Sequence, residues 1–282
     1  MREAIIVTSN KPVLTPVGTV EKSLNLSPSY GEQVWAIADV EFRKMLRDPT
    51  EIFSRAIQPI LWLLIFGQVF SKLRDIPTGG LSYLAFMAPG VLAQSVLFCA
   101  IFYGINVIWE KDMGVIHKLL VSPASRSALV LGKAISSGFR GLVQAGIIYL
   151  MAFLLHIGLN LTLLHILGVL VAVVLGSAIF STFSLIIACW VKSRDRFMGI
   201  GQVLTMPLFF ASSAIYPIAM MPDWLKIVAR FNPLTYLVDA MRTLMIQGAQ
   251  SVEGLGTDFA IMTLVFVVFI FISTRLYPNL IR

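Results

Sequence analysis

The chain has 282 residues, of which 57% are hydrophobic and only 13% are charged, and its mean hydropathy is +0.83. This composition excludes an ordinary soluble domain and predicts an all-α polytopic membrane protein. The formal net charge is +7, but the basic residues cluster at the ends of apolar runs, as orientation signals do. We therefore expect no nucleic-acid partner.

The N-terminal 49 residues divide into two parts. Residues 1–31 are rich in Pro, Ser, Thr and Asn and lack the apolar core of a cleaved signal peptide, so we expect a retained, flexible cytoplasmic N-terminus. Residues 32–49 show an apolar stripe at helical spacing with basic residues opposite, which predicts an amphipathic helix in the cytoplasmic membrane interface. The residues assigned to its two faces are Trp35, Phe42, Arg43 and Arg47.

Residues 50–282 form a six-span transmembrane domain in this interpretation. The predicted spans are about 51–71, 82–109, 127–156, 161–191, 197–216 and 258–277. Most of them have an uncharged stretch that can cross a hydrocarbon core about 30 Å thick. With the N-terminus inside, 15 Lys and Arg residues fall in inner segments and five in outer ones, so we place both termini in the cytoplasm and the chain in the cell membrane.

Arg140 is an exception, because it lies deep in the third predicted span. A charge at that depth costs about 2.5–3.5 kcal/mol, which leaves two alternatives. Either Arg140 faces a partner, a cavity or a lipid headgroup, or the span starts early and the side chain snorkels to the inner surface.

A charged segment, 109–126, separates the second and third predicted spans. Its apolar residues recur at helical spacing, and the helix should end before Pro123. The apolar stripe consists of Val115, Ile116, Leu119 and Leu120, with Lys111, Asp112, His117 and Lys118 on the other side. This helix either lies on the bilayer surface or is displaced by a soluble partner that contacts it.

Residues 212–242 read SSAIYPIAMMPDWLKIVARFNPLTYLVDAMR and predict two short helices that start near Pro222 and at Asn232-Pro233. Each is too short to cross, so we expect outer re-entrant helices that dip into the outer leaflet or lie along it. Asp239 and Arg242, three residues apart, are expected to pair. The residues assigned to this region are Pro217, Trp224, Asn232, Pro233, Tyr236, Asp239 and Arg242.

These motifs resemble the signature of the type-2 ATP-binding-cassette exporter permease family. In that family a proline-containing exit from span five leads to P-x-W-L and then to N-P-L-T-Y followed by an Arg. The likeness covers nearly the whole chain, because it extends to Asp48-Pro49, to Met87-Ala-Pro-Gly90, and to Glu110-x-x-x-Gly114 with Leu119-Leu120-x-Ser122-Pro123. Within the family the chain looks most like drug-resistance and lipo-oligosaccharide exporter permeases.

The resemblance implies two copies of this subunit, paired with two cytoplasmic ATPase subunits that would bind the ATP and Mg. This chain would bind no cofactor and would not be an enzyme, and it contains no G-x-x-x-x-G-K-[ST] motif. The central helix would be the coupling helix, its apolar stripe filling a groove on the ATPase and Glu110 and Lys118 pairing at the rim of that groove. The implied coupling residues are Glu110, Gly114, Val115, Ile116, Lys118, Leu119 and Leu120.

A hydrophobic or lipid-linked substrate would leave the cytoplasm or inner leaflet along a dimer interface formed by spans one, two and five. The candidate pathway residues are Trp62, Phe66, Phe86, Phe98, Phe102, Arg140, Met206, Phe209 and Phe210. Each of these taken singly also fits simple packing against lipid or a neighbouring helix. Two other functions stay open, an ATP-independent secondary carrier or channel and a non-transporting membrane scaffold. The lack of acidic residues within the predicted spans counts against the carrier. We expect no metal site, because the three histidines are scattered.

Overall fold

The computed structural model describes residues 29–47, 49–71, 78–122, 124–191 and 193–280. In these ranges the regular structure is helical, apart from one isolated antiparallel bridge between Leu159 and Ile246, so the all-α prediction is confirmed. Most of the predicted N-terminal segment 1–31, and Pro123 at the expected end of the central helix, lie outside the described residues.

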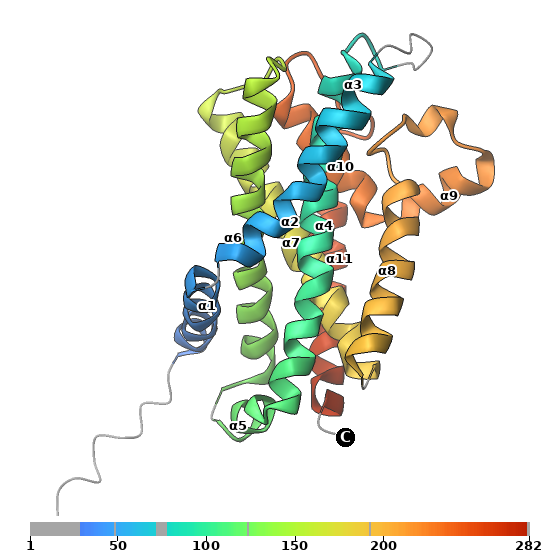
Figure 1. Cartoon of the computed structure of the whole chain (residues 1–282). Coiled ribbons are helices and arrows are strands. Elements are labelled where there is room, and N and C mark those ends of the chain that lie inside the picture. Colours follow the sequence, from blue (N-terminus) through green and yellow to red (C-terminus); the bar gives the residue numbers. More distant parts are fainter. Residues whose placement is uncertain (1–28, 48, 72–77, 123, 192, 281–282) are drawn as a thin grey trace, which may run out of the picture.

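Four helices are long and apolar enough to cross a membrane, namely α4 (Tyr83–Asp112), α6 (Arg126–Leu154), α7 (Leu163–Trp190) and α11 (Leu255–Leu276). They stand side by side in one bundle, which supports a polytopic membrane protein (Figure 1). Serine side chains begin two of them, since Ser82 and Ser125 accept hydrogen bonds from the first-turn amides of α4 and α6. At 30 residues, α4 is about 45 Å long and extends past a hydrocarbon core.

The remaining two predicted spans form shorter helices. The first consists of α2 (Pro49–Leu61), a π-helical turn η1 (Trp62–Phe66) and α3 (Gly67–Phe70). The fifth is α8 (Arg194–Phe210), which stops before the predicted end at residue 216. The side-chain amide of Asn232 donates to the carbonyls of Leu208 and Ala211, at 2.6 and 3.2 Å, and so satisfies two groups at the end of α8. A count of six spans stays a prediction.

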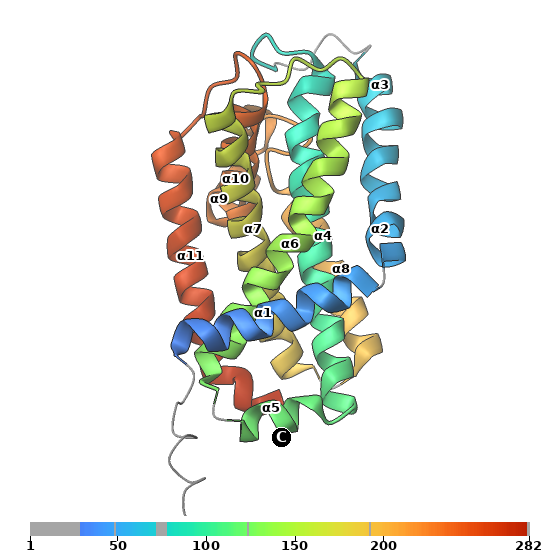
Figure 2. The same ribbon diagram turned by 90° about the vertical axis from the view of Figure 1, so that its left-hand side faces the viewer.

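Helix α1 (Tyr30–Arg47) lies across the side of the bundle and crosses α6 (Figure 2). Gly132 of α6 permits the close approach, because a Cβ atom there would lie 2.7 Å from the Cβ of Ile37 and 2.9 Å from the carbonyl oxygen of Val34. The face of α1 that packs on the bundle consists of Val34, Ala38, Glu41 and Met45. Trp35 and Leu46 point away from the bundle and are more than half exposed, at 65% and 62%.

The short helix α5 (Val115–Val121) follows α4 through Gly114, whose φ of +71° lies in the left-handed region that favours glycine. It lies at the same end of the bundle as the C-terminal turn η3 (Tyr277–Leu280) (Figure 1). Toward the opposite end lie the turn η2 (Ile218–Met220) and the helices α9 (Asp223–Phe231) and α10 (Pro233–Met245).

The two short outer helices differ in their packing. Ten of the thirteen residues of α10 are buried, and this helix packs on α4, α7 and α11. In α9 only Ala229 is buried, whereas Trp224 and Phe231 are 67% and 84% exposed. The apolar side of α10 is therefore part of the protein core, and α9 is the helix left to contact the surroundings.

Candidate functional site

Five charged side chains meet where α1, the end of α4 and α6 come together. We call this set, Glu41, Lys44, Glu110, Lys133 and Arg140, the charge cluster. Lys133 Nζ lies 2.6 Å from Glu110 Oε2 and 3.5 Å from Glu41 Oε1. Lys44 Nζ lies 2.7 Å from Glu110 Oε1 and 3.0 Å from Glu41 Oε1. The two carboxylates are thus shared by two lysines, and the contacts join three helices.

Most of this cluster is removed from solvent. Glu41, Glu110, Lys133 and Arg140 are each less than a tenth exposed, whereas the Lys44 side chain is about half exposed, at 48%. Burial alone would raise the pKa of Glu41, but the charges of Lys133 and Lys44 outweigh it and lower this pKa to about 2. The carboxylate therefore stays charged at neutral pH and holds α1 against the bundle.

The lowered pKa of Glu41 predicts a pH dependence with a definite sign. Its contribution to stability is fully present above the ordinary pKa of about 4.5 and is lost as the pH falls toward 2. We expect the difference in melting temperature between the wild type and Glu41→Gln to stay constant from pH 8 down to about 4.5 and to shrink below it. Thermal unfolding of both proteins in one detergent checks this. A difference that changes between pH 6 and 8 would contradict it.

Arg140 belongs to the same cluster. Its Nη2 lies 4.0 Å from Glu41 Oε2, and its guanidinium carbon lies 4.8 Å from the ring centre of Tyr103 on α4. The side chain is only 8% exposed, so it faces partners inside the protein and does not snorkel to the surface. These contacts separate Arg140 from the aromatic pathway candidates with which the sequence grouped it.

The two residues expected at the rim of the ATPase groove, Glu110 and Lys118, lie in different environments. Glu110 lies in the last turn of α4, where it is buried and bonded to Lys133 and Lys44. Lys118 is exposed on α5. Glu110 is therefore closed off from a contact at such a rim, whereas Lys118 is accessible to one.

An apolar groove of about 360 Å³ lies between α1 and α5, and the charge cluster forms one side of it. We call it the α1–α5 groove. The apolar part of its lining includes Ile37 and Val40 of α1, Val115 and Leu119 of α5, and Leu129 of α6.

The face of α5 that the sequence assigned to a partner is largely turned inward. Ile116 is fully buried and packs with Ile108 and Leu129, which is incompatible with an external contact. Val115 and Leu119 are half-buried in the groove, and the Leu120 side chain lies outside the described part of the structure. The exposed residues of α5 are His117, Lys118 and Val121, the last at 88%. The physical reason is that a seven-residue helix must cover the open ends of α4 and α6 with its apolar side.

The residues assigned to α1 also divide differently from the prediction. Phe42 packs against Phe139 of α6, with ring centres 4.9 Å apart, whereas Trp35 faces outward. Arg43 pairs with Asp39 at 2.8 Å, and Arg47 is exposed. Sequence reasoning missed Glu41 and Lys133. The available signal was an acid within the buried stripe of one amphipathic helix and a base within an apolar helix.

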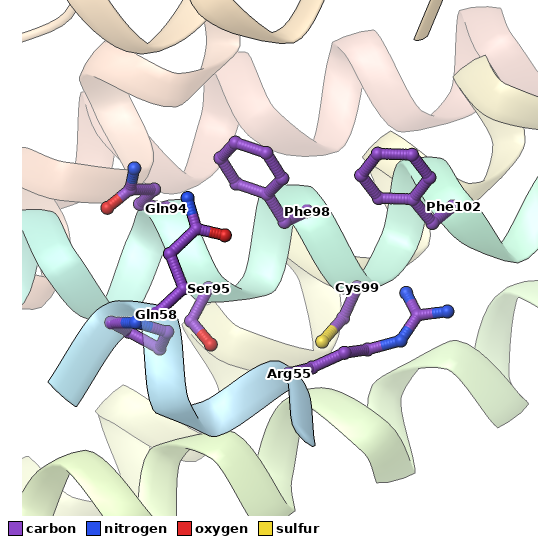
Figure 3. Close-up of a pocket in the computed structure, with 8 residues that line it drawn as sticks. Arg55, Gln58, Gln94, Ser95, Phe98, Cys99 and Phe102 are labelled. Carbon is purple, nitrogen blue, oxygen red and sulfur yellow. The ribbon is translucent and has the colours of Figure 1, made fainter. Parts of the chain in front are cut away.

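The aromatic pathway candidates of spans one and five touch each other. The Trp62 ring stacks on Phe66 at 4.3 Å and meets the edge of Phe209 on α8 at 5.9 Å. Phe66, Met206 and Phe210 are 42%, 39% and 43% exposed, so part of this surface is open. On α4, Phe98 and Phe102 stack at 6.1 Å and line a cavity with Arg55 of α2 (Figure 3).

Phe86 is placed differently, because it lies under the guanidinium of Arg242 at 3.8 Å, toward the α10 end of the bundle. Arg242 donates to the carbonyls of Phe86 and Ser213, at 3.3 and 2.5 Å. Asp239 accepts from the Ser251 hydroxyl and the Val252 amide, both at 2.8 Å. The structure therefore gives Asp239 and Arg242 separate partners, contrary to the expected pair.

The remaining outer residues fix local structure. Asn232 caps α10 by accepting from the Leu234 amide at 3.0 Å, and Pro233 occupies the first position of that helix. The Tyr236 hydroxyl donates to the Arg230 carbonyl at 2.7 Å. Pro217 lines a cavity of about 440 Å³ together with Asp239 and Arg242. These contacts connect α8, α9 and α10 at one end of the bundle.

Comparisons with known proteins identify the family to which the chain belongs. Residues 32–246 match the family model described as ABC-2 type transporter. The chain is 28% identical over 219 residues to the putative transport permease ycf38 of Cyanophora paradoxa, which covers 76% of this chain and 74% of the relative. It is 24% identical over 227 residues to nodulation protein J of Rhizobium leguminosarum bv. viciae, covering 80% and 85%.

A third relative is the probable doxorubicin resistance ABC transporter permease protein DrrC of Mycobacterium tuberculosis, 24% identical over 200 residues and 70% of each chain. The family match spans more than half of the chain and contains α1, α5 and the α8–α10 region. The chain therefore belongs to the ABC-2 type transporter permease family and is a multi-pass membrane subunit of an ABC transporter.

Proposed function

We propose that this permease exports a hydrophobic or lipid-linked substrate and is powered by a separate cytoplasmic ATPase that docks on α5 and the α1–α5 groove. The observation that carries the proposal is the connection of α5 to the bundle. Glu110 lies one turn before Gly114, and its carboxylate is held by Lys133 of α6 and Lys44 of α1. A displacement of α5 would therefore act on α4, α6 and α1 together.

The docking surface has an apolar and a charged part. Val121 is exposed on α5, and Val40 is exposed on the α1 side of the groove. Burial of a valine side chain contributes about 1.5–3 kcal/mol, whereas a rim charge such as Lys118 contributes about 0–1 kcal/mol. The apolar contacts should dominate assembly, and the charges should set its orientation.

A second copy of the chain would complete the transport pathway. Exposed apolar residues of η1, α3 and α8 flank α4 and offer a face for this contact, among them Ile65, Val69, Val203 and Phe210. In this assembly two ATPase subunits bind the ATP and Mg, and both termini and α5 lie on the cytoplasmic side of the cell membrane. The doxorubicin resistance named for one relative is consistent with an apolar substrate.

An ATP-independent carrier is the main alternative. The sequence argument against it assumed that the spans lack acidic residues, but Glu110 in the last turn of α4 and Asp258 in the first turn of α11 are buried. Glu110 is already paired with two lysines, which assigns its carboxylate to the contact between the helices. Reconstituted permease that moves substrate without ATP would establish the alternative.

The docking proposal predicts that Val121→Asp lowers the amount of ATPase recovered with the purified permease about tenfold, because a buried valine contact is lost. The measurement is affinity purification of the tagged chain from membranes that also contain the ATPase, with quantification of both chains. Val252→Asp is the matched control, since Val252 is also exposed, at 72%, but lies in the loop next to Asp239 at the other end. Equal recovery of the ATPase with both variants, and with Leu119→Asp, would contradict the docking proposal and support the alternative that α5 lies on the bilayer surface.

A further inference from the structure

A cavity of about 130 Å³ lies between α2 and α4, on the same side of α4 as the pathway candidates Phe98 and Phe102. From α2, Arg55 extends alongside Phe102, and the amide of Gln58 points toward α4 (Figure 3). From α4, Gln94 and Ser95 contribute polar groups to the lining.

One polar atom of this lining has no protein partner. Gln94 is only 3% exposed, and its Oε1 is buried without a hydrogen bond. A buried acceptor that stays unpaired is unfavourable, and a ligand with an O–H or N–H group removes this cost. Ser95 is already engaged, because its hydroxyl donates to Gln144 at 2.9 Å. The lining therefore offers one acceptor that protein groups do not use.

The lining of the cavity contains a basic residue. Arg55 is its cationic residue, with the guanidinium carbon 5.8 Å from the ring centre of Phe102, and none of the described lining residues is acidic. Arg55 lies six residues after the start of α2, or about 9 Å along the helix, on the side where α1 lies. This depth is close to that of the phosphate groups of an inner leaflet if α1 lies in the interface.

The volume limits what can bind. Pockets that enclose a drug-sized ligand have about 300–1,000 Å³, so a cavity of about 130 Å³ holds only a small head group. Any larger apolar part must lie outside it, against Phe98 and Phe102 and the neighbouring surface of α2, where Ile57 and Leu61 are about half exposed.

We propose that this cavity binds the head group of an anionic amphiphile. A phosphate or carboxylate contacts Arg55, a hydroxyl or N–H of the head group donates to Gln94 Oε1, and the apolar tail lies along Phe98 and Phe102. Arginine is suited to this role because its planar guanidinium can hold two oxygens at once. The inference rests on the proposed function in one respect, since it gives the exported substrate, or a lipid that accompanies it, a chemical class.

Binding to the purified full-length chain tests the proposal without an ATPase. Two probes share one dansyl-labelled dodecyl chain and end in a phosphate or a trimethylammonium group. We expect Arg55→Gln to weaken binding of the phosphate probe about tenfold or more and to spare the trimethylammonium probe. Arg55→Lys keeps the charge but loses the two-oxygen contact, so we expect its phosphate binding to lie between those of the wild type and Arg55→Gln. Arg126→Gln, which removes an exposed arginine at the start of α6, should stay close to the wild type.

Two further binding measurements test the role of Gln94 and the need for an apolar tail. Gln94→Leu should weaken a glycerophosphate-headed probe more than the plain phosphate probe, because only the former has hydroxyls to donate. Inorganic phosphate at the same concentration should fail to displace the probe, since it lacks the tail.

Three results would overturn the inference. They are equal loss of both probes in Arg55→Gln, unchanged phosphate binding in that variant, and displacement by inorganic phosphate as effective as by the amphiphile. If phosphate binding is unchanged and the oligomeric state of Arg55→Gln is altered, Arg55 contacts the second copy of the chain and does not bind a ligand. Such a failure together with intact ATP-driven transport leaves the proposed function standing. If the chain binds the phosphate probe selectively but no ATPase is recovered with it, the inference stands and the proposed function fails.

Discussion

Replacing Lys133 with methionine should lower the free energy of unfolding by about 3–5 kcal/mol, because the change leaves buried carboxylates without their buried partner. Lys133 Nζ lies 2.6 Å from Glu110 and 3.5 Å from Glu41, and all three side chains are less than a tenth exposed. Lys44 contacts both carboxylates but is half exposed, so it compensates only in part. Reversible unfolding in detergent or thermal unfolding measures the loss.

Two controls make this test specific. Lys118→Met removes an exposed lysine of α5 and should change stability by less than about 1 kcal/mol. The double variant Lys133→Met with Glu110→Gln removes one charge of each sign and should recover part of the loss, which a double-mutant cycle quantifies. Equal stability of Lys133→Met and Lys118→Met would show that the charge cluster has no net stabilising role.

The cluster also shows where sequence reasoning stops. Its cross-helix contacts join residues 66 and 92 positions apart, beyond the reach of any helical periodicity. Local patterns do predict that residues 32–49 and 109–126 form amphipathic helices. They do not decide which face meets the bundle when a helix has apolar residues on both sides. In α1 the prediction placed Trp35 in the apolar stripe, but the structure leaves Trp35 exposed and packs the acidic Glu41 against the bundle.

A similar limit applies to α5 and to the outer helices. Helical spacing grouped Ile116 with Leu119, but only the positions of α4 and α6 determine that Ile116 is buried. The rule that residues three apart can pair favoured Asp239 with Arg242. Backbone donors and acceptors from remote segments, such as Val252 and Ser213, bind them instead. Capping was more reliable, since Asn232-Pro233 does begin α10.

The Met87-Ala-Pro-Gly90 motif has a packing role that its composition did not predict. Helix α4 continues through the motif, with Pro89 inside the helix. Gly90 faces the turn after α8, and a Cβ atom at this position would lie 2.2 Å from the backbone carbonyl oxygen of Ala214. Side chains essentially never approach backbone so closely. The turn that leads toward α9 and α10 therefore packs on α4 only because residue 90 is glycine.

Gly90→Ala should therefore destabilise the protein by about 1–3 kcal/mol, the cost of overpacking, even though alanine favours a helix over glycine by about 1 kcal/mol. Gly146→Ala on α6 is the matched control, because no atom lies within 4 Å of its added Cβ, and this variant should be neutral or slightly more stable. Thermal unfolding of the two variants in one detergent separates the helix effect from the packing effect. If both raise the melting temperature, the contact between α4 and the Ala214 turn does not constrain the fold. If only Gly90→Ala lowers it, the glycine of this motif holds the α8–α10 region against the central helix.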